Sequence, residues 1–142
     1  MGEIRQLEGL NIVVAGGHGG LGAALSAGLA DAIEDVQGQV GRIDGLVNAA
    51  GITSSSPFLE TSGDSWDRVL GVNLTGAFNL CQAVAGAMAQ NAPSQGSRGS
   101  IVNIASLCSK VGCQFVAAYS ASKSGLLGLT RVMAMELGPL GI

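Results

Sequence analysis

Residues 10–22 of the chain, LNIVVAGGHGGLG, decide the fold. A short apolar run rich in β-branched residues ends at a turn with five glycines in seven residues, and a helical pattern follows. Strand, glycine-rich turn and helix in this order are typical of a dinucleotide-binding loop. Glycines let the backbone approach a pyrophosphate, while the helix that follows offers free N–H groups and the positive end of its dipole. We predict phosphate binding at this turn, with a flexible connector as the alternative.

Apolar spacing predicts the remaining elements. It indicates a helix over residues 21–40, strands over 43–49 and 100–105, and a last helix over 116–137 that Gly138 and Pro139 stop. Another helix begins at a cap formed by Ser62 or Asp64. Its predicted core face consists of Trp66, Leu70, Leu74, Phe78, Cys81, Val84 and Met88.

The alternation of apolar strands with helices predicts the fold class, because this order is typical of a parallel sheet covered by helices. We expect an α/β protein with a reduced Rossmann-like three-layer fold, a small parallel sheet and one domain over residues 1–142. Ligands of such folds bind at the carboxyl ends of the strands. Gly16, Gly51 and Ser106 all follow predicted strands.

Tyr119 and Lys123 carry the clearest chemical signal. They are four residues apart in a predicted helix, so the phenol and the ammonium lie on the same face. A phenol with a pKa near 10 is a poor acid or base at neutral pH, and a neighbouring cation lowers that pKa. Such a tyrosine could exchange a proton with a carbonyl oxygen. The alternative is an ordinary surface pair on an amphipathic helix.

At these positions the chain resembles the short-chain dehydrogenase/reductase family. Gly16, Gly20 and Gly22 match the family's cofactor loop, with Ala15 in place of the usual threonine. Residues 46–51, LVNAAG, are similar to its Asn-Asn-Ala-Gly strand end, with Ala49 in place of the second asparagine. The matches to its catalytic tetrad are Asn73, Ser106, Tyr119 and Lys123.

The resemblance implies an NAD(P)-dependent oxidoreductase that interconverts an alcohol and a carbonyl, with a small-molecule substrate. Tyr119 would be the general acid/base, and Lys123 would lower its pKa and bind the nicotinamide ribose. Ser106 would hold the substrate oxygen, and Asn73 would anchor a water. Residues implied to bind NAD or NADP are Gly16, His18, Gly20, Leu21, Gly22, Asn48, Ala49, Ala50, Gly51, Tyr119 and Lys123.

Two of these residues could have a structural role in place of the functional role. Ser106 could be a turn residue at the end of a strand. Asn73 could be a buried polar group that a neighbouring backbone satisfies.

The chain departs from the family pattern in two places. Between Gly22 and Asn48 the family has three helices and two strands, whereas here one helix fills the interval. Asp35 and Asp44 are not placed to bind an adenosine ribose. The chain ends at Ile142, before the family's nicotinamide-contacting and substrate-binding segments. The alternative function is a catalytically inactive, truncated relative that acts, if at all, by oligomeric association.

The shortened interval has structural consequences. We expect strands 12–15 and 101–104 to be the outer strands, with exposed edges that favour self-pairing. A direct right-handed crossover between the first two strands is expected to move its helix away from the face that the first helix covers in complete relatives.

Composition limits the partners. Charged residues make up 12% and apolar residues 47% of the chain, which favours self-association as a homodimer or homotetramer. A net charge of −3 without a basic cluster argues against nucleic acid. One histidine, His18, and no acidic cluster predict no metal site.

Two further features bear on location. Cys81, Cys108 and Cys113 are odd in number and lack metal-ligand spacing, so we interpret them as small buried hydrophobes in a reducing compartment. We find no signal peptide and no run of eighteen apolar residues, and we expect a soluble cytoplasmic protein with no membrane partner.

Overall fold

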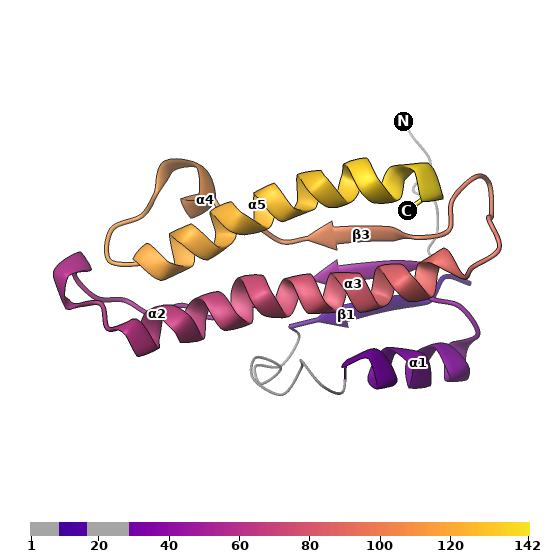
Figure 1. Ribbon diagram of the computed structural model, residues 1–142, viewed down its shortest axis with the longest axis horizontal. Helices are drawn as coiled ribbons and strands as arrows, with labels where there is room; N and C mark the ends of the chain where they lie inside the picture. Colours follow the sequence, from indigo (N-terminus) through magenta and orange to yellow (C-terminus); the bar gives the residue numbers. More distant parts are fainter. Residues whose placement is uncertain (1–8, 17–28) are drawn as a thin grey trace.

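The computed structural model describes residues 9–16 and 29–142 (Figure 1). Short apolar stretches form the strands, and longer amphipathic stretches form the helices. In chain order the elements are β1 (Ile12–Ala15), α1 (Leu29–Val40), β2 (Gly45–Asn48), a 3-10 helix (Phe58–Glu60), α2 (Gly63–Leu70), a π-helix (Gly71–Thr75), α3 (Gly76–Ala89), β3 (Ser100–Asn103), α4 (Cys108–Val111), α5 (Ala117–Leu137) and a final 3-10 helix (Gly138–Leu140).

The three strands form one parallel sheet in the order β1-β2-β3. Ile12 is opposite Gly45, which in turn is opposite Ser100, and this register continues along all three strands. The predicted α/β class with a small parallel sheet is confirmed, and so is the position of β1 and β3 at the edges.

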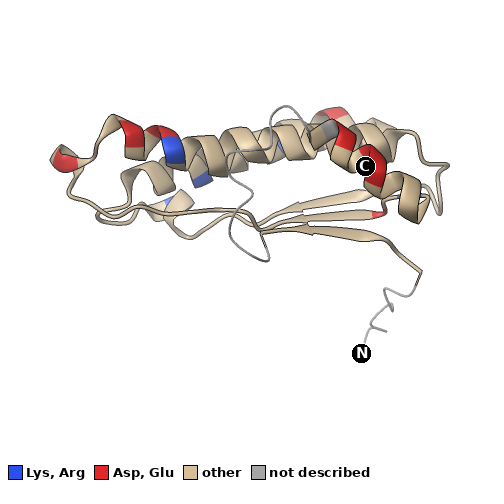
Figure 2. Ribbon diagram, turned by 90° about the horizontal axis from the view of Figure 1, so that it is seen from below, with Lys and Arg blue, Asp and Glu red and all other residues tan. Residues whose placement is uncertain are grey.

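The described helices lie on one face of the sheet, as Figure 2 shows. The core between the two layers contains Leu29 and Ile33 from α1, Leu46 from β2, and Val84 and Met88 from α3. Strand order explains this arrangement. Right-handed crossovers carry a connecting helix to the same face whenever successive strands are added in the same direction. The described residues therefore form a sheet with one layer of helices, and residues 17–28 of the predicted first helix lie outside them.

The opposite face of the sheet is apolar and exposed. The side chains of successive residues in a strand alternate between faces, so every second residue points away from the helices. Ile12 and Val14 of β1, Val102 of β3 and Ile104 just after it are all exposed, with 62% of Val14 accessible. No described helix covers these residues.

α2, the π-helix and α3 form one continuous helix. Ser62 caps its start by accepting a hydrogen bond from the backbone N–H of Ser65 at 3.2 Å, which confirms the first of the two predicted caps. Its buried residues include Val69, Asn73, Ala77, Leu80, Cys81, Val84 and Met88.

The predicted face of this helix is correct at Cys81, Val84 and Met88 and wrong at Phe78, which is 44% exposed. The π turn lies between the two halves. It takes up an additional residue and so rotates the side chains of α2, which packs against α5, relative to those of α3.

Helix Gly63–Ala89 is also long and apolar enough to cross a membrane, with a mean hydropathy of 1.2, although we expected no such segment. Val84 and Met88 of this helix belong to the core on the sheet, and 39% of the apolar window is buried.

The cysteines differ from our expectation. Cys81 is free and buried, as we predicted. Cys108 and Cys113, however, form a disulfide, with their Cα atoms 5.2 Å apart. α4 and the turn at Gly112 return the chain to within the distance that a disulfide requires. Our interpretation of these two residues as buried thiols is wrong.

Candidate active site

The candidate site lies at the carboxyl ends of the strands. Gly16 follows β1, Gly51 follows β2, and Ser106 follows β3. Tyr119 and Lys123 are in the first turns of α5. Parallel strands bring these separate parts of the sequence to one edge of the sheet.

Lys123 is buried, with 4% of its surface exposed. Its Nζ donates a hydrogen bond to the carbonyl of Ile104 at 2.8 Å and lies 6.0 Å from the centre of the Tyr119 ring. Burial lowers the pKa of Lys123, because the low-dielectric surroundings disfavour the ammonium. The shared face predicted from the spacing of Tyr119 and Lys123 is consistent with this distance.

Gly51 brings the end of β2 against two of these side chains. A Cβ atom at Gly51 would lie 3.4 Å from Lys123 Nζ and 3.5 Å from Asn73 Oδ1. Hydrogen at this position leaves space for the lysine and the asparagine to come together beside the strand.

Asn73 joins three segments from within the π-helix. Its Oδ1 accepts from the N–H of Ile52 at 2.8 Å, and its Nδ2 donates to the carbonyl of Ile52 at 2.9 Å and to Ser122 Oγ at 3.0 Å. Ser122 Oγ in turn donates to the carbonyl of Tyr119 at 2.8 Å. Asn73 thus fixes the loop after β2 relative to α5. This is the structural alternative that the sequence left open.

Ser106 begins the turn that leads into α4. Its hydroxyl oxygen accepts from the backbone N–H of Cys108 at 3.2 Å, and its carbonyl accepts from Ser109. Accepting this bond leaves the hydroxyl proton available for a ligand. Ser106 is therefore a turn residue whose side chain can still donate.

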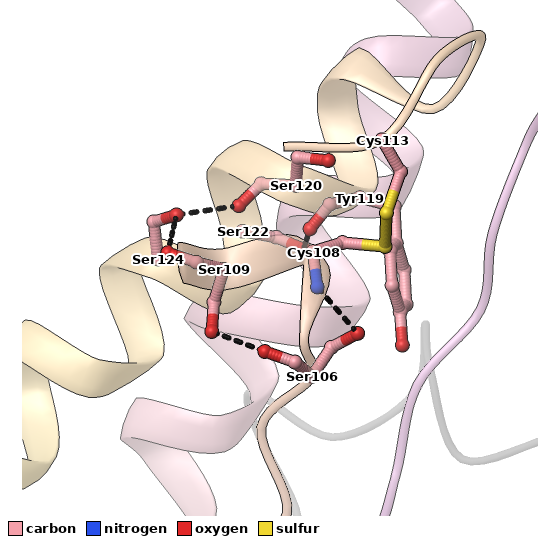
Figure 3. Close-up of a disulfide and its surroundings, with 8 residues drawn as sticks. All are labelled: Ser106, Cys108, Ser109, Cys113, Tyr119, Ser120, Ser122 and Ser124. Carbon is pink, nitrogen blue, oxygen red and sulfur yellow. Dashed lines mark hydrogen bonds between the residues drawn. A yellow bond between two sulfur atoms is a disulfide. The ribbon is translucent and has the colours of Figure 1, made fainter. Parts of the chain in front are cut away.

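An open pocket of about 620 Å³ lies between these segments. It is lined by Gly51, Ile52, Thr53, Ser106, Cys108, Cys113, Gln114, Val116 and Tyr119. Figure 3 shows the phenol of Tyr119 and the hydroxyl of Ser106 on the same side of this region, next to the disulfide. The pocket contains a hydroxyl donor and a phenol, and Nζ of the buried lysine lies 6.0 Å from the centre of the phenol ring.

Gly16 has a structural reason to be glycine. Its φ is +101°, and a Cβ atom would lie 2.6 Å from the backbone carbon of Ala49. The exit of β1 passes the exit of β2 at this point, where Ala49 N–H donates to the carbonyl of Ala15 at 2.9 Å. The other predicted loop residues, His18, Gly20, Leu21 and Gly22, lie outside the described residues.

Asn48 differs in placement from Ala49, Ala50 and Gly51. It is 1% exposed, its Nδ2 donates to Asn103 Oδ1 at 2.9 Å, and its Oδ1 accepts from Ala50 N–H at 3.3 Å. Ala49 and Gly51 are exposed beside it. The Asn48 side chain therefore belongs to an internal network, whereas the backbone that follows borders the pocket.

Sequence reasoning missed Asn103, which extends this network. Asn103 lies opposite Asn48 in the sheet and donates to Thr130 Oγ1 on α5 at 3.1 Å. The signal was present, because residues 46–48 and 101–103 both end in Val-Asn and two parallel strands in register align such endings.

The residues fit one half of a nicotinamide dinucleotide. Within the described residues, Lys123 has one hydrogen-bond partner and two remaining N–H groups, and Gly51 lines the pocket beside it. In doubly wound sheets the cofactor crevice forms where the strand order reverses. The order of the described strands, β1-β2-β3, contains no reversal. Among the described residues, the fit therefore extends to the nicotinamide ribose alone.

The fold and the site define an α/β protein of the Rossmann type with a serine, a tyrosine and a lysine at its strand ends. Comparison with known proteins narrows this class. The family model for short chain dehydrogenases matches residues 26–142 and so begins after the glycine turn. The chain belongs to the short-chain dehydrogenase family.

Three curated relatives illustrate the similarity. Human (3R)-3-hydroxyacyl-CoA dehydrogenase is 47% identical over 97 residues, which are 68% of this chain and 36% of the relative. Carbonyl reductase 2 (NADPH) of Sus scrofa is 43% identical, with coverages of 77% and 43%. D-threitol dehydrogenase of Mycolicibacterium smegmatis is 39% identical, with coverages of 89% and 48%. The chain spans less than half the length of each of these relatives.

A solved structure agrees with the fold. A crystal structure from Sinorhizobium meliloti 1021, assigned as a short-chain alcohol dehydrogenase, superposes with a TM-score of 0.71 at 38% identity. The superposition covers 78% of this chain and 42% of the other.

Proposed function

We propose that this chain carries the proton-transfer centre of an NAD(P)-dependent oxidoreductase that interconverts an alcohol and a carbonyl. The observation that supports this proposal is that Ser106 and Tyr119 line one pocket, with Lys123 Nζ 6.0 Å from the centre of the Tyr119 ring. The names of the relatives, which include a hydroxyacyl-CoA dehydrogenase and a carbonyl reductase, support the same class of reaction.

Each residue has a defined role in the proposed reaction. The Ser106 hydroxyl donates a hydrogen bond to the carbonyl oxygen of the substrate and holds it beside the phenol. Tyr119 transfers its proton to that oxygen as the carbonyl carbon is reduced, and takes it back in the oxidative direction. Lys123 places positive charge next to the phenol and offers its remaining N–H groups to the nicotinamide ribose. NAD(P), when bound, supplies or accepts the hydride.

Asn73 acts at a distance from the substrate in this proposal. It holds Ile52, which lines the pocket, against Ser122 on α5. It is therefore a positioning residue, and water anchoring remains part of the proposal.

The cofactor should bind weakly. Loss of two adenosine hydrogen bonds, at about 1 to 1.5 kcal/mol each, weakens binding by roughly 30- to 150-fold. We expect slow turnover at high cofactor concentration.

The test is a comparison of three proteins: wild type, Tyr119→Phe, and Ser55→Ala as an exposed control in the neighbouring loop. Binding is followed by nicotinamide fluorescence, and turnover by NAD(P)H oxidation with a panel of ketones. We expect Tyr119→Phe to retain cofactor binding and lose turnover by about 10²-fold or more, as for loss of a general acid. Turnover that survives in Tyr119→Phe would remove this tyrosine from the reaction.

A second function is favoured by a different observation. The groove between α3 and α5 has a volume of about 330 Å³ and is lined mainly by apolar residues, including Phe78, Leu129, Val132, Met133 and Leu140. We propose that these helices mediate a homodimer or homotetramer, with or without catalysis. Light scattering of wild type and Phe78→Lys tests this. An unchanged oligomeric mass in the variant would place the interface elsewhere, and a monomeric wild type would end the proposal.

A further inference from the structure

The Cys108–Cys113 disulfide forms part of the wall of the candidate active-site pocket. Both cysteines line this pocket together with Ser106 and Tyr119. Figure 3 shows the sulfur atoms beside the tyrosine ring. The proposed reaction gives the two cysteines no role, although they lie next to the residues that carry it.

Cys108 is tied to the strand side of the pocket. Its backbone N–H donates to Ser106 Oγ at 3.2 Å, so its position affects where the serine hydroxyl points. Ser109, the next residue, also donates to the Ser106 carbonyl. The first turn of α4 and Ser106 therefore form one local unit.

Cys113 is tied to the opposite wall. It leads through Gln114 to Phe115, whose carbonyl accepts from Ser56 N–H at 2.8 Å. Phe115 has a φ of +66°, which a bulky side chain rarely adopts, so its surroundings must hold it there. The disulfide thus connects the segment at Ser106 to the loop that follows Gly51.

The three cysteines differ in access to solvent. Cys113 is exposed, Cys108 is half-buried, and Cys81 is buried in the core at 2% exposure. A dissolved thiol can therefore reach the disulfide at Cys113 Sγ without opening the core. Access of this kind is one of the factors that set the rate of thiol–disulfide exchange.

We propose that Cys108–Cys113 is a redox-active pair that small-molecule thiols reduce reversibly, and that its reduction loosens the pocket wall between Ser106 and Val116. A thiolate attacks Cys113 Sγ, the S–S bond breaks, and Cys108 leaves as a thiolate that takes up a proton. A second thiol attacks the mixed disulfide and releases Cys113. Two thiols are oxidised to one disulfide, and the protein gains two electrons and two protons.

The inference depends on the pocket geometry and not on the proposed oxidoreductase reaction. Its test therefore needs no catalytic activity. Failure of the proposed function would show as absent turnover, whereas failure of this inference would show in the labelling or the hydrogen exchange described next.

The first measurement is native alkylation followed by intact mass spectrometry. Protein purified without reductant should take up no iodoacetamide. After dithiothreitol it should take up two equivalents, with Cys81 labelled only after unfolding. Cys81→Ala is the control and should give the same two equivalents. A pair that stays unlabelled after native reduction would overturn the proposal. So would a pair found free at the outset that oxidised glutathione does not close.

The second measurement is hydrogen exchange of the peptide covering residues 106–116. Release of a short covalent loop should accelerate exchange there by about tenfold or more, while α3 stays unchanged. The double variant Cys108→Ser/Cys113→Ser should exchange at the fast rate with or without dithiothreitol. If the variant does not fold, the reduced wild type decides alone. Equal exchange in reduced and oxidised protein would refute the structural effect.

Discussion

Asn73 is the single side chain that holds most of the site together. Its amide satisfies both backbone groups of Ile52 and contacts Ser122, and none of its surface is exposed. Removing it leaves buried polar groups without partners, and each unsatisfied group costs free energy. Its contribution to stability can be measured separately from any role in catalysis.

We expect Asn73→Ala to lower the free energy of unfolding by about 2 to 4 kcal/mol, because the N–H and carbonyl of Ile52 lose their partners. Urea unfolding followed by circular dichroism measures this. Asn79→Ala, at a half-buried position on α3, should change stability by less than about 0.5 kcal/mol. Equal effects of the two variants would mean that the Ile52 contacts contribute little.

Lys123 predicts a pH dependence. Burial lowers its pKa below the ordinary value of 10.5, so the folded state binds this proton less tightly than the unfolded chain does. Between the lowered pKa and 10.5 the unfolded state binds more protons, and stability therefore rises with pH across that window. Below the window the buried charge costs a constant amount.

The measurement compares Tyr119→Phe with Tyr119→Phe/Lys123→Met, so that the two proteins differ only at the lysine. The free energy of unfolding of the single variant, minus that of the double variant, should increase as the pH rises toward the ordinary lysine pKa of 10.5, because burial lowers the pKa of Lys123 in the folded state. A flat difference would show that Lys123 keeps its ordinary pKa in the folded protein.

The part of the site that depends on local spacing along the chain could be predicted from the sequence. The four-residue interval between Tyr119 and Lys123 sets a shared helical face whatever the rest of the fold does. The disulfide could not be predicted from the sequence, because it depends on the turn at Gly112, where φ is +69°. The pairing of Asn48 with Asn103 was missed although both strands end in Val-Asn, because recognising it requires the register of the sheet.

At the scale of elements, the strictest constraint on the sequence lies where the chain leaves β1 and β2. There the backbone of Gly16 lies close to the backbone of Ala49. Gly16 and Gly41 both have φ in the left-handed region, but only Gly16 faces backbone atoms. A Cβ at Gly41 would meet nothing within 4 Å. An alanine at Gly41 would therefore introduce backbone strain alone, whereas an alanine at Gly16 would introduce strain and a steric clash.

We expect Gly41→Ala to cost about 1 kcal/mol from the left-handed conformation alone. Gly16→Ala should cost about 2 to 4 kcal/mol, because the added carbon also displaces the Ala49 backbone. Thermal unfolding of both variants measures the difference. Equal destabilisation by the two substitutions would show that Gly16 does not lie close to the Ala49 backbone.

The elements themselves were largely predictable, and their faces were not. Apolar β-branched runs and helical periodicity located β2, β3 and α5 to within a few residues. The face of the long helix was misassigned at Phe78, which lies in the regular helix α3 at the edge of the stripe that Ala77, Leu80, Cys81, Val84 and Met88 bury. A spacing of three or four residues does not distinguish the centre of such a stripe from its edge.

For the whole molecule, the main consequence comes from the sheet, because the described helices cover only one of its faces. Val14, Val47 and Val102 are aligned across the three strands on the face without described helices. Val14 and Val102 are exposed at 62% and 49%. Exposed apolar patches of this kind favour association or binding of hydrophobic probes.

We expect Val14→Thr/Val102→Thr to reduce binding of a hydrophobic dye and self-association, with stability changed by less than about 0.5 kcal/mol. Threonine keeps the β-branch that suits a strand. The control is Val13→Thr, whose side chain packs against the core and whose substitution should destabilise the fold. Dye fluorescence and light scattering that do not change in the double variant would argue that this face is covered in solution.

The π turn at Gly71–Thr75 also makes the site sensitive to chain length. Each residue of an α-helix turns the chain by about 100°. Deleting one residue from this turn would restore a regular helix. It would also rotate Gly63–Leu70 about the helix axis relative to α3. The arrangement around the tyrosine and the lysine thus depends on a single surplus residue in the backbone, even where every side chain of the site is retained.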